Sequence, residues 1–313
     1  MRRNDLDYAR GIAILLILIG HTNGMSDLTV KLIYSVHVPL FFVICGVLLC
    51  YNQTAQKSWS YICSNRLKRI IVPSIIWECI LSTFYYIIKD IPVKQLIENS
   101  LTLNFNLSVL WFIPCLLLAE MTWILIVKVW KRDVSFYICM CGMFVFSAIA
   151  VFVRALFVKR ILVALVFIIC GYGLEHSRKN LTVDKVISNQ LILLIIGIVW
   201  GIATMMNVRV DISAGVLGNI VLYYLHSVAG SVAIILVCGM ISTQINLLSW
   251  VGKNTMGFLV THVFVRHAII IIEEKILGYF LGGWALAIPM ILVDICVVFV
   301  IGRTFPKIFG KNI

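Results

Sequence analysis

The sequence predicts an all-α membrane protein that crosses a bilayer many times. Of its 313 residues, 61% are hydrophobic and only 13% are charged, and the mean hydropathy is +1.02. A soluble domain usually carries about 25% charged residues. The apolar residues also gather in runs long enough for a helix to cross the hydrocarbon core. A membrane β-barrel would instead show short segments of alternating polarity, so we expect every span to be helical.

Ten apolar runs, separated by short polar segments, predict about ten membrane-spanning helices. No stretch has the composition of a soluble domain, a linker or an internal repeat, so we expect residues 1–313 to form a single transmembrane domain. Lys159 and Arg160 interrupt the sixth run. The expected spans cover residues 6–24, 34–51, 70–88, 108–129, 134–153, 155–174, 187–206, 214–241, 255–272 and 279–301.

The distribution of lysine and arginine predicts that both termini lie in the cytoplasm. With that orientation, the cytoplasmic loops hold about twice as many basic residues as the opposite loops, as the positive-inside rule requires. This bias explains the formal net charge of +12 without a nucleic-acid partner. One outer loop breaks the pattern, because it holds Arg154, Lys159 and Arg160. Either the sixth boundary is misplaced or this patch meets an anionic partner.

The ten cysteines are scattered, most of them within apolar runs. They form no CxxC pair and have no ligand-like spacing to histidine, so we interpret them as small buried side chains rather than disulfides or a metal site. We expect no metal and no permanently bound cofactor.

The stretch from Asn4 to Asn23 places ionisable residues on an otherwise apolar helix. Arg10 and His21 bracket the segment 11–20, which is entirely apolar or glycine. On a helix they point within about 20° of each other and lie about 16 Å apart along the axis. Ionisable groups inside a membrane are costly and are functional candidates. A neutral histidine there can take a proton from a hydroxyl, whereas a structural histidine would bond a backbone carbonyl at the helix end.

Two further groups of charged residues belong to the same expected side of the membrane. Asp7 lies three residues before Arg10 and can pair with it. Arg66 and Arg69 have the same spacing, with Lys68 between them, and two arginines on one helix face suit the recognition of phosphate. The alternative for the second group is the positive-inside bias alone.

Five ordered segments carry motifs that extend over nearly the whole chain. They are RNDLDYARGIAILLILIGH at 3–21, HVPLFFVICGVLL at 37–49, RLKR at 66–69 followed by Pro73, LWFIPCLLLAE at 110–120 and VGKNTMGFLVTHVFV at 251–265. Together they resemble the acyltransferase family 3 membrane proteins. The chain departs from the family pattern at Cys45 and Thr255, where serine is common.

The resemblance implies an enzyme of the bacterial inner membrane that transfers an acyl group, usually acetyl from cytoplasmic acetyl-CoA, to a hydroxyl of a surface or exported carbohydrate. We expect His21 to act as general base and Arg10 to bind the donor or stabilise the site electrostatically. Arg66, Lys68 and Arg69 would bind the CoA phosphates. The expected partners are the acyl-CoA donor, the carbohydrate acceptor and the lipid bilayer.

Other polar and aromatic residues are candidates for the lining of this site. We expect Glu120 and Glu78 either to orient a histidine or pair with Arg266, or to form a structural ion pair, and we expect His37 to approach His21 across a short loop. Direct transfer is the expected route, with an acetyl-histidine or an acetyl-Cys45 relay as the alternative. The candidate lining residues are Asp7, His37, Trp111, Glu120 and His262.

Two rival functions use the same residues. Intramembrane Arg, Glu and His residues also suit a transporter or flippase for a glycan precursor or a small metabolite, although paired halves with interrupted helices are not visible in the sequence. A sensor or partner-binding subunit that keeps the fold without catalysis is the second rival.

Overall fold

The computed structural model describes residues 3–101, 109–130, 136–180, 190–241, 243–279 and 281–311. Within these ranges the regular structure is helical, apart from one isolated bridge between Asp211 and Val216. The predicted all-α fold is therefore confirmed. Among the described residues, seven helices are long and apolar enough to cross a membrane, and two shorter apolar helices accompany them, Tyr137–Phe152 and Gln190–Met206.

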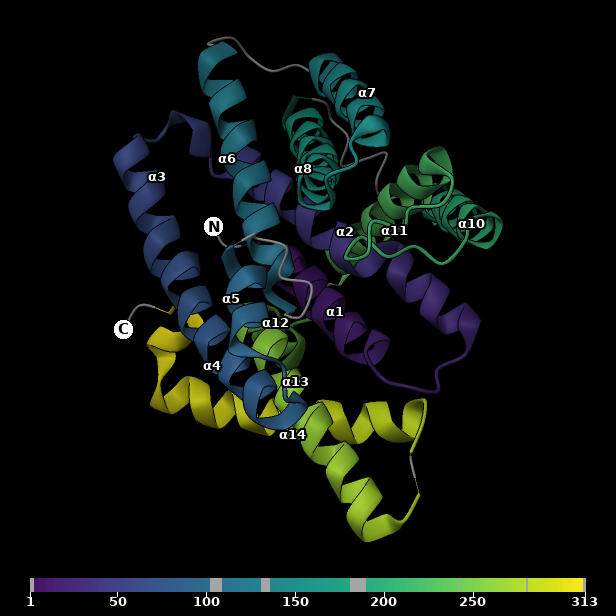
Figure 1. The fold of residues 1–313 in the computed structure, drawn as a ribbon. Coiled ribbons are helices and arrows are strands. Elements are labelled where there is room, and N and C mark those ends of the chain that lie inside the picture. Colours follow the sequence, from purple (N-terminus) through teal and green to yellow (C-terminus); the bar gives the residue numbers. More distant parts are fainter. Residues whose placement is uncertain are drawn as a thin grey trace.

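The helices follow one another with short connections, as Figure 1 shows. A π-helical turn, η2, joins two of them, and a 3₁₀ turn, η3 (Val109–Trp111), precedes another. The elements are α1 (Asn4–Gly20), α2 (Asp27–Tyr51), α3 (Trp59–Arg66), η2 (Leu67–Ile71), α4 (Val72–Lys89), α5 (Val93–Leu101), α6 (Phe112–Trp130), α7 (Phe136–Phe152), α8 (Leu156–Asn180), α10 (Gln190–Met206), α11 (Ile220–Met240), α12 (Asn246–Lys253), α13 (Thr255–Ile272) and α14 (Trp284–Thr304).

Each predicted span overlaps one of these helices, but several boundaries differ. The second helix begins at Asp27 rather than 34, because the Ser26 side chain caps it. The eighth begins at Ile220 rather than 214, because the Asn219 side chain accepts hydrogen bonds from the amides of Val221 and Leu222 in the first turn. Helices α3, α5 and α12 were not predicted. Residues 108, 134–135, 187–189 and 280 of the expected spans lie outside the described residues, and the cytoplasmic placement of both termini stays a prediction.

Helix α1 lies at the centre of the bundle, in contact with α2, α11, α12, α13 and α14 (Figure 1). Its approach to α12 is close because both helices carry glycine at the crossing. A Cβ atom at Gly252 would lie 1.8 Å from the Asp7 carbonyl oxygen, and one at Gly11 would lie 2.6 Å from the Leu248 carbonyl oxygen. Small residues allow membrane helices to pack backbone against backbone. The apolar faces of α1 are therefore covered by protein.

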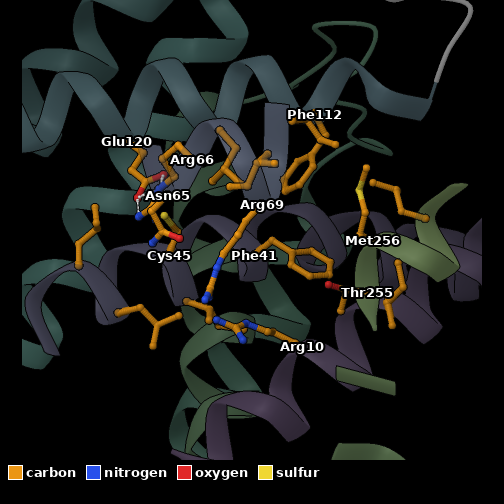
Figure 2. A pocket seen from close by; sticks show the side chains of 18 of the residues that line it. Arg10, Phe41, Cys45, Asn65, Arg66, Arg69, Phe112, Glu120, Thr255 and Met256 are labelled. Carbon is orange, nitrogen blue, oxygen red and sulfur yellow. Dashed lines mark hydrogen bonds and ion pairs between the residues drawn. The ribbon is translucent and has the colours of Figure 1, made fainter. Parts of the chain in front are cut away.

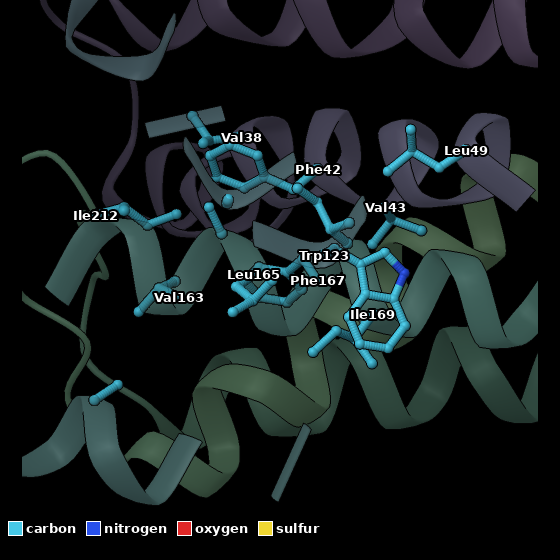
Figure 3. Close-up of a cluster of buried hydrophobic side chains, with 14 of the residues drawn as sticks. Val38, Phe42, Val43, Leu49, Trp123, Val163, Leu165, Phe167, Ile169 and Ile212 are labelled. Carbon is cyan, nitrogen blue, oxygen red and sulfur yellow. The ribbon is translucent and has the colours of Figure 1, made fainter. Parts of the chain in front are cut away.

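Helices α2 and α8 form a second close crossing, in which two glycines occupy reciprocal positions. A Cβ atom at Gly46 would lie 2.0 Å from the Ile168 carbonyl oxygen, and one at Gly171 would lie 2.0 Å from the Val43 carbonyl oxygen. Beside this crossing lies the largest buried apolar cluster, to which α6 contributes Trp123 (Figure 3). This packing positions α2 and α6, which line the site described below.

We predict that Gly171→Leu disrupts the α2–α8 crossing, because the added side chain has no space without separating the two backbones. Overpacking of this kind costs about 1–3 kcal/mol. The thermal unfolding midpoint in detergent should fall. Gly197→Ala in α10 is the matched control, since no atom lies within 4 Å of a Cβ added there. Equal midpoints for the two variants would contradict the packing argument.

Candidate active site

A cavity of about 460 Å³ opens where α1, α2, η2, α6 and α13 meet. We call it the arginine cavity because Arg10, Arg66 and Arg69 line it, and Figure 2 shows their side chains extending into it from different elements. Cys45 from α2 and Thr255 from α13 also contribute to the wall. Three guanidinium groups on one cavity of this size make a site for an anion with several acceptor oxygens.

Lys68 does not belong to this cavity. Arg66 and Arg69 share one face of the turn, as their spacing predicts, whereas Lys68 is exposed and does not line the cavity. The reason is geometric, because residues at i and i+3 face the same way on a helical turn and the residue between them does not. The structure therefore brings together two of the three basic residues of the RLKR motif.

Arg66 and Glu120 form a fork-to-fork ion pair at one end of the arginine cavity (Figure 2). The Arg66 Nε atom donates to the two Glu120 carboxylate oxygens at 3.1 and 3.0 Å, and an Nη atom donates to Oε1. Glu120 is buried, so its charge needs this partner. Of the alternatives for Glu120, the structure shows the structural ion pair, with Arg66 rather than Arg266 as its partner. Arg266 instead donates to the Asn23 side chain at 3.1 Å.

Arg10 pairs with Asp7 as predicted, with 3.4 Å between the Arg10 Nη1 and Asp7 Oδ1 atoms. Asp7 is buried and Arg10 is half-buried. The pair holds one end of the Arg10 guanidinium, and Arg10 also lines the cavity. A cation on this wall is thus held in place before any ligand arrives.

A second, smaller cavity of about 60 Å³ lies at the other end of α1. We call it the histidine cavity, because His21 and His37 line it together with Tyr34, Trp111 and Asp211. The Nδ1 atom of each histidine lies 2.8 Å from the carbonyl oxygen four residues earlier in its helix. A carbonyl oxygen only accepts, so Nδ1 carries a proton in both rings. In the neutral imidazole the lone pair is then on Nε2.

His262 supports this arrangement from α13 without lining either cavity. Its ring centroid lies 5.1 Å from that of His21, and its Nδ1 atom bonds the Phe258 carbonyl oxygen at 3.0 Å. His262 is buried. It packs against the side of the His21 ring and so restricts the orientation of that ring.

The two cavities share three wall residues, Ile17, Phe112 and Leu259. We call these three residues the neck. The Phe112 ring is held by contacts with Phe41 and Phe42, at centroid distances of 5.7 and 5.1 Å. Helix α1 thus presents Arg10 to one cavity and the residue that follows the helix, His21, to the other, with the three apolar residues of the neck between them.

A family model, described as the acyltransferase domain of acyltransferase family 3, matches residues 3–303. The chain belongs to acyltransferase family 3. The comparisons with curated proteins and with solved structures give no match. Membership supports a membrane acyltransferase in general terms, with an acyl donor and an acceptor.

In this acyltransferase, the loop 207–219 between α10 and α11 forms part of the wall of the histidine cavity. The sequence predicted a connection over 207–213, but neither its full length nor this role. The loop contributes Asp211, Ile212 and Ser213 to the wall. The Asn207 side chain ties its two ends together, because Nδ2 donates to the Leu217 carbonyl oxygen at 3.1 Å and Oδ1 accepts from the Asn219 amide at 2.9 Å. The polar and glycine residues of this loop were the available signal.

Two of the three basic residues of the predicted outer loop, Lys159 and Arg160, donate hydrogen bonds to the loop 207–219. Arg160 is buried, lies 5.1 Å from the centre of the Trp111 ring, and donates to the Ser213 carbonyl oxygen. Lys159 Nζ lies 3.4 Å from the Gly215 carbonyl oxygen. The sixth boundary is correct, since α8 begins at Leu156. Arg160 therefore does not form an open anion-binding surface, and only Arg154 of the three is exposed.

The described residues contain no group of three or more His, Cys, Asp or Glu side chains placed to hold a metal ion.

We predict that Arg66 and Glu120 are energetically coupled. Arg66→Gln leaves a buried carboxylate without its cation, and Glu120→Gln leaves a guanidinium without its anion, so each should lower the thermal unfolding midpoint. The double variant removes both charges and should lose less than the sum, by about 0.5–3 kcal/mol. The Lys94–Glu98 pair, which is exposed and separated by 4.0 Å, is the control and should show no coupling. Additive effects for Arg66 and Glu120 would contradict the pairing.

Proposed function

We propose that the protein is a membrane O-acyltransferase that moves an acetyl group from cytoplasmic acetyl-CoA to a hydroxyl of a surface or exported carbohydrate of a bacterial cell. The observation that carries the proposal is the pair of cavities on α1. One is lined by arginines, the other by imidazoles, and the two meet at the neck.

The arginine cavity has the properties needed to bind the donor. Its volume of about 460 Å³ falls within the usual range for small-molecule sites. Arg10, Arg66 and Arg69 supply charge-assisted hydrogen bonds for the CoA phosphates. The positive-inside bias orients this end of α1 toward the cytoplasm, where acetyl-CoA is found.

The histidine cavity has the properties needed to activate the acceptor. His21 Nε2 takes the proton of the acceptor hydroxyl, and the hydroxyl oxygen attacks the thioester carbonyl carbon. The tetrahedral intermediate collapses as the carbon–sulfur bond breaks, and the imidazolium returns the proton to the CoA thiolate. The products are the acetyl ester and CoA. General-base assistance of this kind contributes about 10²–10⁴-fold, and positioning at the neck contributes the rest.

Cys45 lies on the wall of the arginine cavity, so an acyl-Cys45 intermediate would form there. His21 lines the other cavity, so an acyl group on Cys45 would still have to cross the neck to reach the acceptor. Direct transfer needs one crossing and no covalent intermediate, and we therefore favour it.

The decisive experiment replaces His21 with alanine. Membranes that contain the protein are given acetyl-CoA labelled in the acetyl group, and the label in the carbohydrate fraction is measured. His21→Ala should lower incorporation at least 100-fold, because the general base is lost. His267→Ala is the control, since His267 lies on the same helix as His262 but lines neither cavity.

Unchanged incorporation in His21→Ala would remove His21 from this role. A purified wild-type protein that neither hydrolyses acetyl-CoA nor transfers from it would favour the transporter or flippase instead.

The neck predicts a preference for a short acyl group. Under the proposed function the acyl group passes between the two cavities beside Phe112, a wall residue of both, so a longer acyl chain should be excluded. Phe112→Ala should raise the rate with butyryl-CoA relative to acetyl-CoA by about tenfold, since each methylene in an apolar pocket is worth roughly 1–3 kcal/mol. Phe144→Ala, at a ring that is 77% exposed on α7, is the matched control. An unchanged ratio in Phe112→Ala would show that the neck does not select the acyl group.

A further inference from the structure

The loop 207–219 forms part of the wall of the histidine cavity, together with His21 and His37. It brings a carboxylate, Asp211, and a hydroxyl, Ser213, to the wall. The other walls include the aromatic rings of Tyr34 and Trp111. Aromatic surface together with acidic and hydroxyl groups is a chemically suitable lining for a polyhydroxylated molecule, whose C–H faces lie on rings and whose hydroxyls donate to carboxylates.

We propose that this loop is the acceptor-recognition element, that Asp211 holds a hydroxyl of the acceptor, and that the reacting group is a primary hydroxyl on a hydroxymethyl arm. The proposal rests on the proposed function, because it assigns the acceptor side of the same reaction.

The hydrogen bonds of Asp211 explain why it can serve a ligand. Within the described part of the chain, its side-chain bonds all use Oδ1, which accepts from the Ser213 amide at 2.9 Å, the Ser213 hydroxyl at 2.6 Å and the Ala214 amide at 3.4 Å. One carboxylate oxygen therefore organises the turn, and Oδ2 keeps its capacity to accept.

The loop is held from several directions, so Asp211 has a defined position. Asn207 fastens its ends, and Arg160 and Lys159 donate to the carbonyl oxygens of Ser213 and Gly215. At the start of the loop, the Arg209 guanidinium lies 4.5 Å from the centre of the Tyr34 ring, and Tyr34 in turn packs edge-on against His37 at 4.8 Å. Arg209 and Tyr34 thus link the loop to the His37 imidazole.

The size of the histidine cavity limits which hydroxyl can react. At about 60 Å³, this cavity is several times smaller than the arginine cavity of about 460 Å³. A hydroxymethyl arm fits such a space while its sugar ring stays outside. A secondary hydroxyl sits directly on the ring, so its reaction would require the ring itself to enter. The cavity therefore favours a primary alcohol.

The position of the ester tests the second part of the proposal. Surface carbohydrate is isolated from cells that express the wild type and from cells that express His21→Ala, and the two are compared by two-dimensional NMR. An acetyl ester that depends on His21 and is attached to a CH₂ carbon supports the proposal, and one attached to a ring CH carbon overturns it. If no ester depends on His21, the proposed function fails, and the inference fails with it.

A conservative variant tests the role of Asp211. Asp211→Asn keeps Oδ1, which accepts the turn's hydrogen bonds, but replaces Oδ2 with a donor. Full-length protein in detergent is given acetyl-CoA and, as acceptor probe, de-O-acetylated surface carbohydrate from the His21→Ala cells. We expect the acceptor KM of Asp211→Asn to rise about tenfold, the loss of one charge-assisted hydrogen bond, with the acetyl-CoA KM unchanged.

The matched control is Asp27→Asn, which removes a carboxylate that is exposed at the start of α2 and should leave both constants unchanged. An unchanged acceptor KM in Asp211→Asn, alongside an active wild type, overturns the inference while the proposed function stands. Equal rises in both constants would indicate a structural role for Asp211 and would also overturn it.

Discussion

The structure depends on the burial of α1 among five other helices. An isolated helix that carried Asp7, Arg10 and His21 across a bilayer would expose ionisable groups to lipid, at a cost of several kcal/mol. Backbone contact at Gly11 and Gly252 brings α12 against one side of α1, while α2, α11 and α13 cover others. Arg10, on α1, and His21, directly after it, line the two cavities. Burial of the helix among its neighbours lowers the free-energy cost of carrying ionisable side chains at these positions.

The same constraint governs the charges around α1. Buried or half-buried ionic groups near the arginine cavity are paired, Asp7 with Arg10 and Glu120 with Arg66. Such pairs rarely add much stability, but the loss of one partner is costly. Each acidic partner leaves its arginine on the cavity wall, so the pairing keeps the guanidinium groups oriented in the absence of a ligand. Preorganised cations bind an anionic ligand without first paying the entropy of ordering their side chains.

The sequence was informative where a single helix carries the signal, and less so where distant segments meet. Periodicity alone placed Arg10 and His21 on one face, Asp7 beside Arg10, and Arg66 with Arg69. The Arg66–Glu120 contact joins residues 54 positions apart, and no local pattern specifies it. Apolar residues in segment 214–219 read as the beginning of a helix, whereas the Asn219 cap and the Asn207 bridge turn that segment into a loop. Tertiary hydrogen bonds override the local sequence pattern in this segment. For that reason the sequence did not predict that the loop 207–219 forms part of the wall of the histidine cavity.

The separation of the two cavities also constrains the donor under the proposed function. Arg10 and His21 are about 16 Å apart along α1 at 1.5 Å per residue, with the apolar neck between them. A donor whose phosphates bind at the arginines must therefore carry its acyl group at the end of an extended, slender and largely uncharged arm. A CoA thioester has this form, whereas a nucleotide sugar or an acyl phosphate keeps its charge beside the reacting group. The neck would admit the thioester and retain the phosphates, and CoA would leave by the side from which it entered.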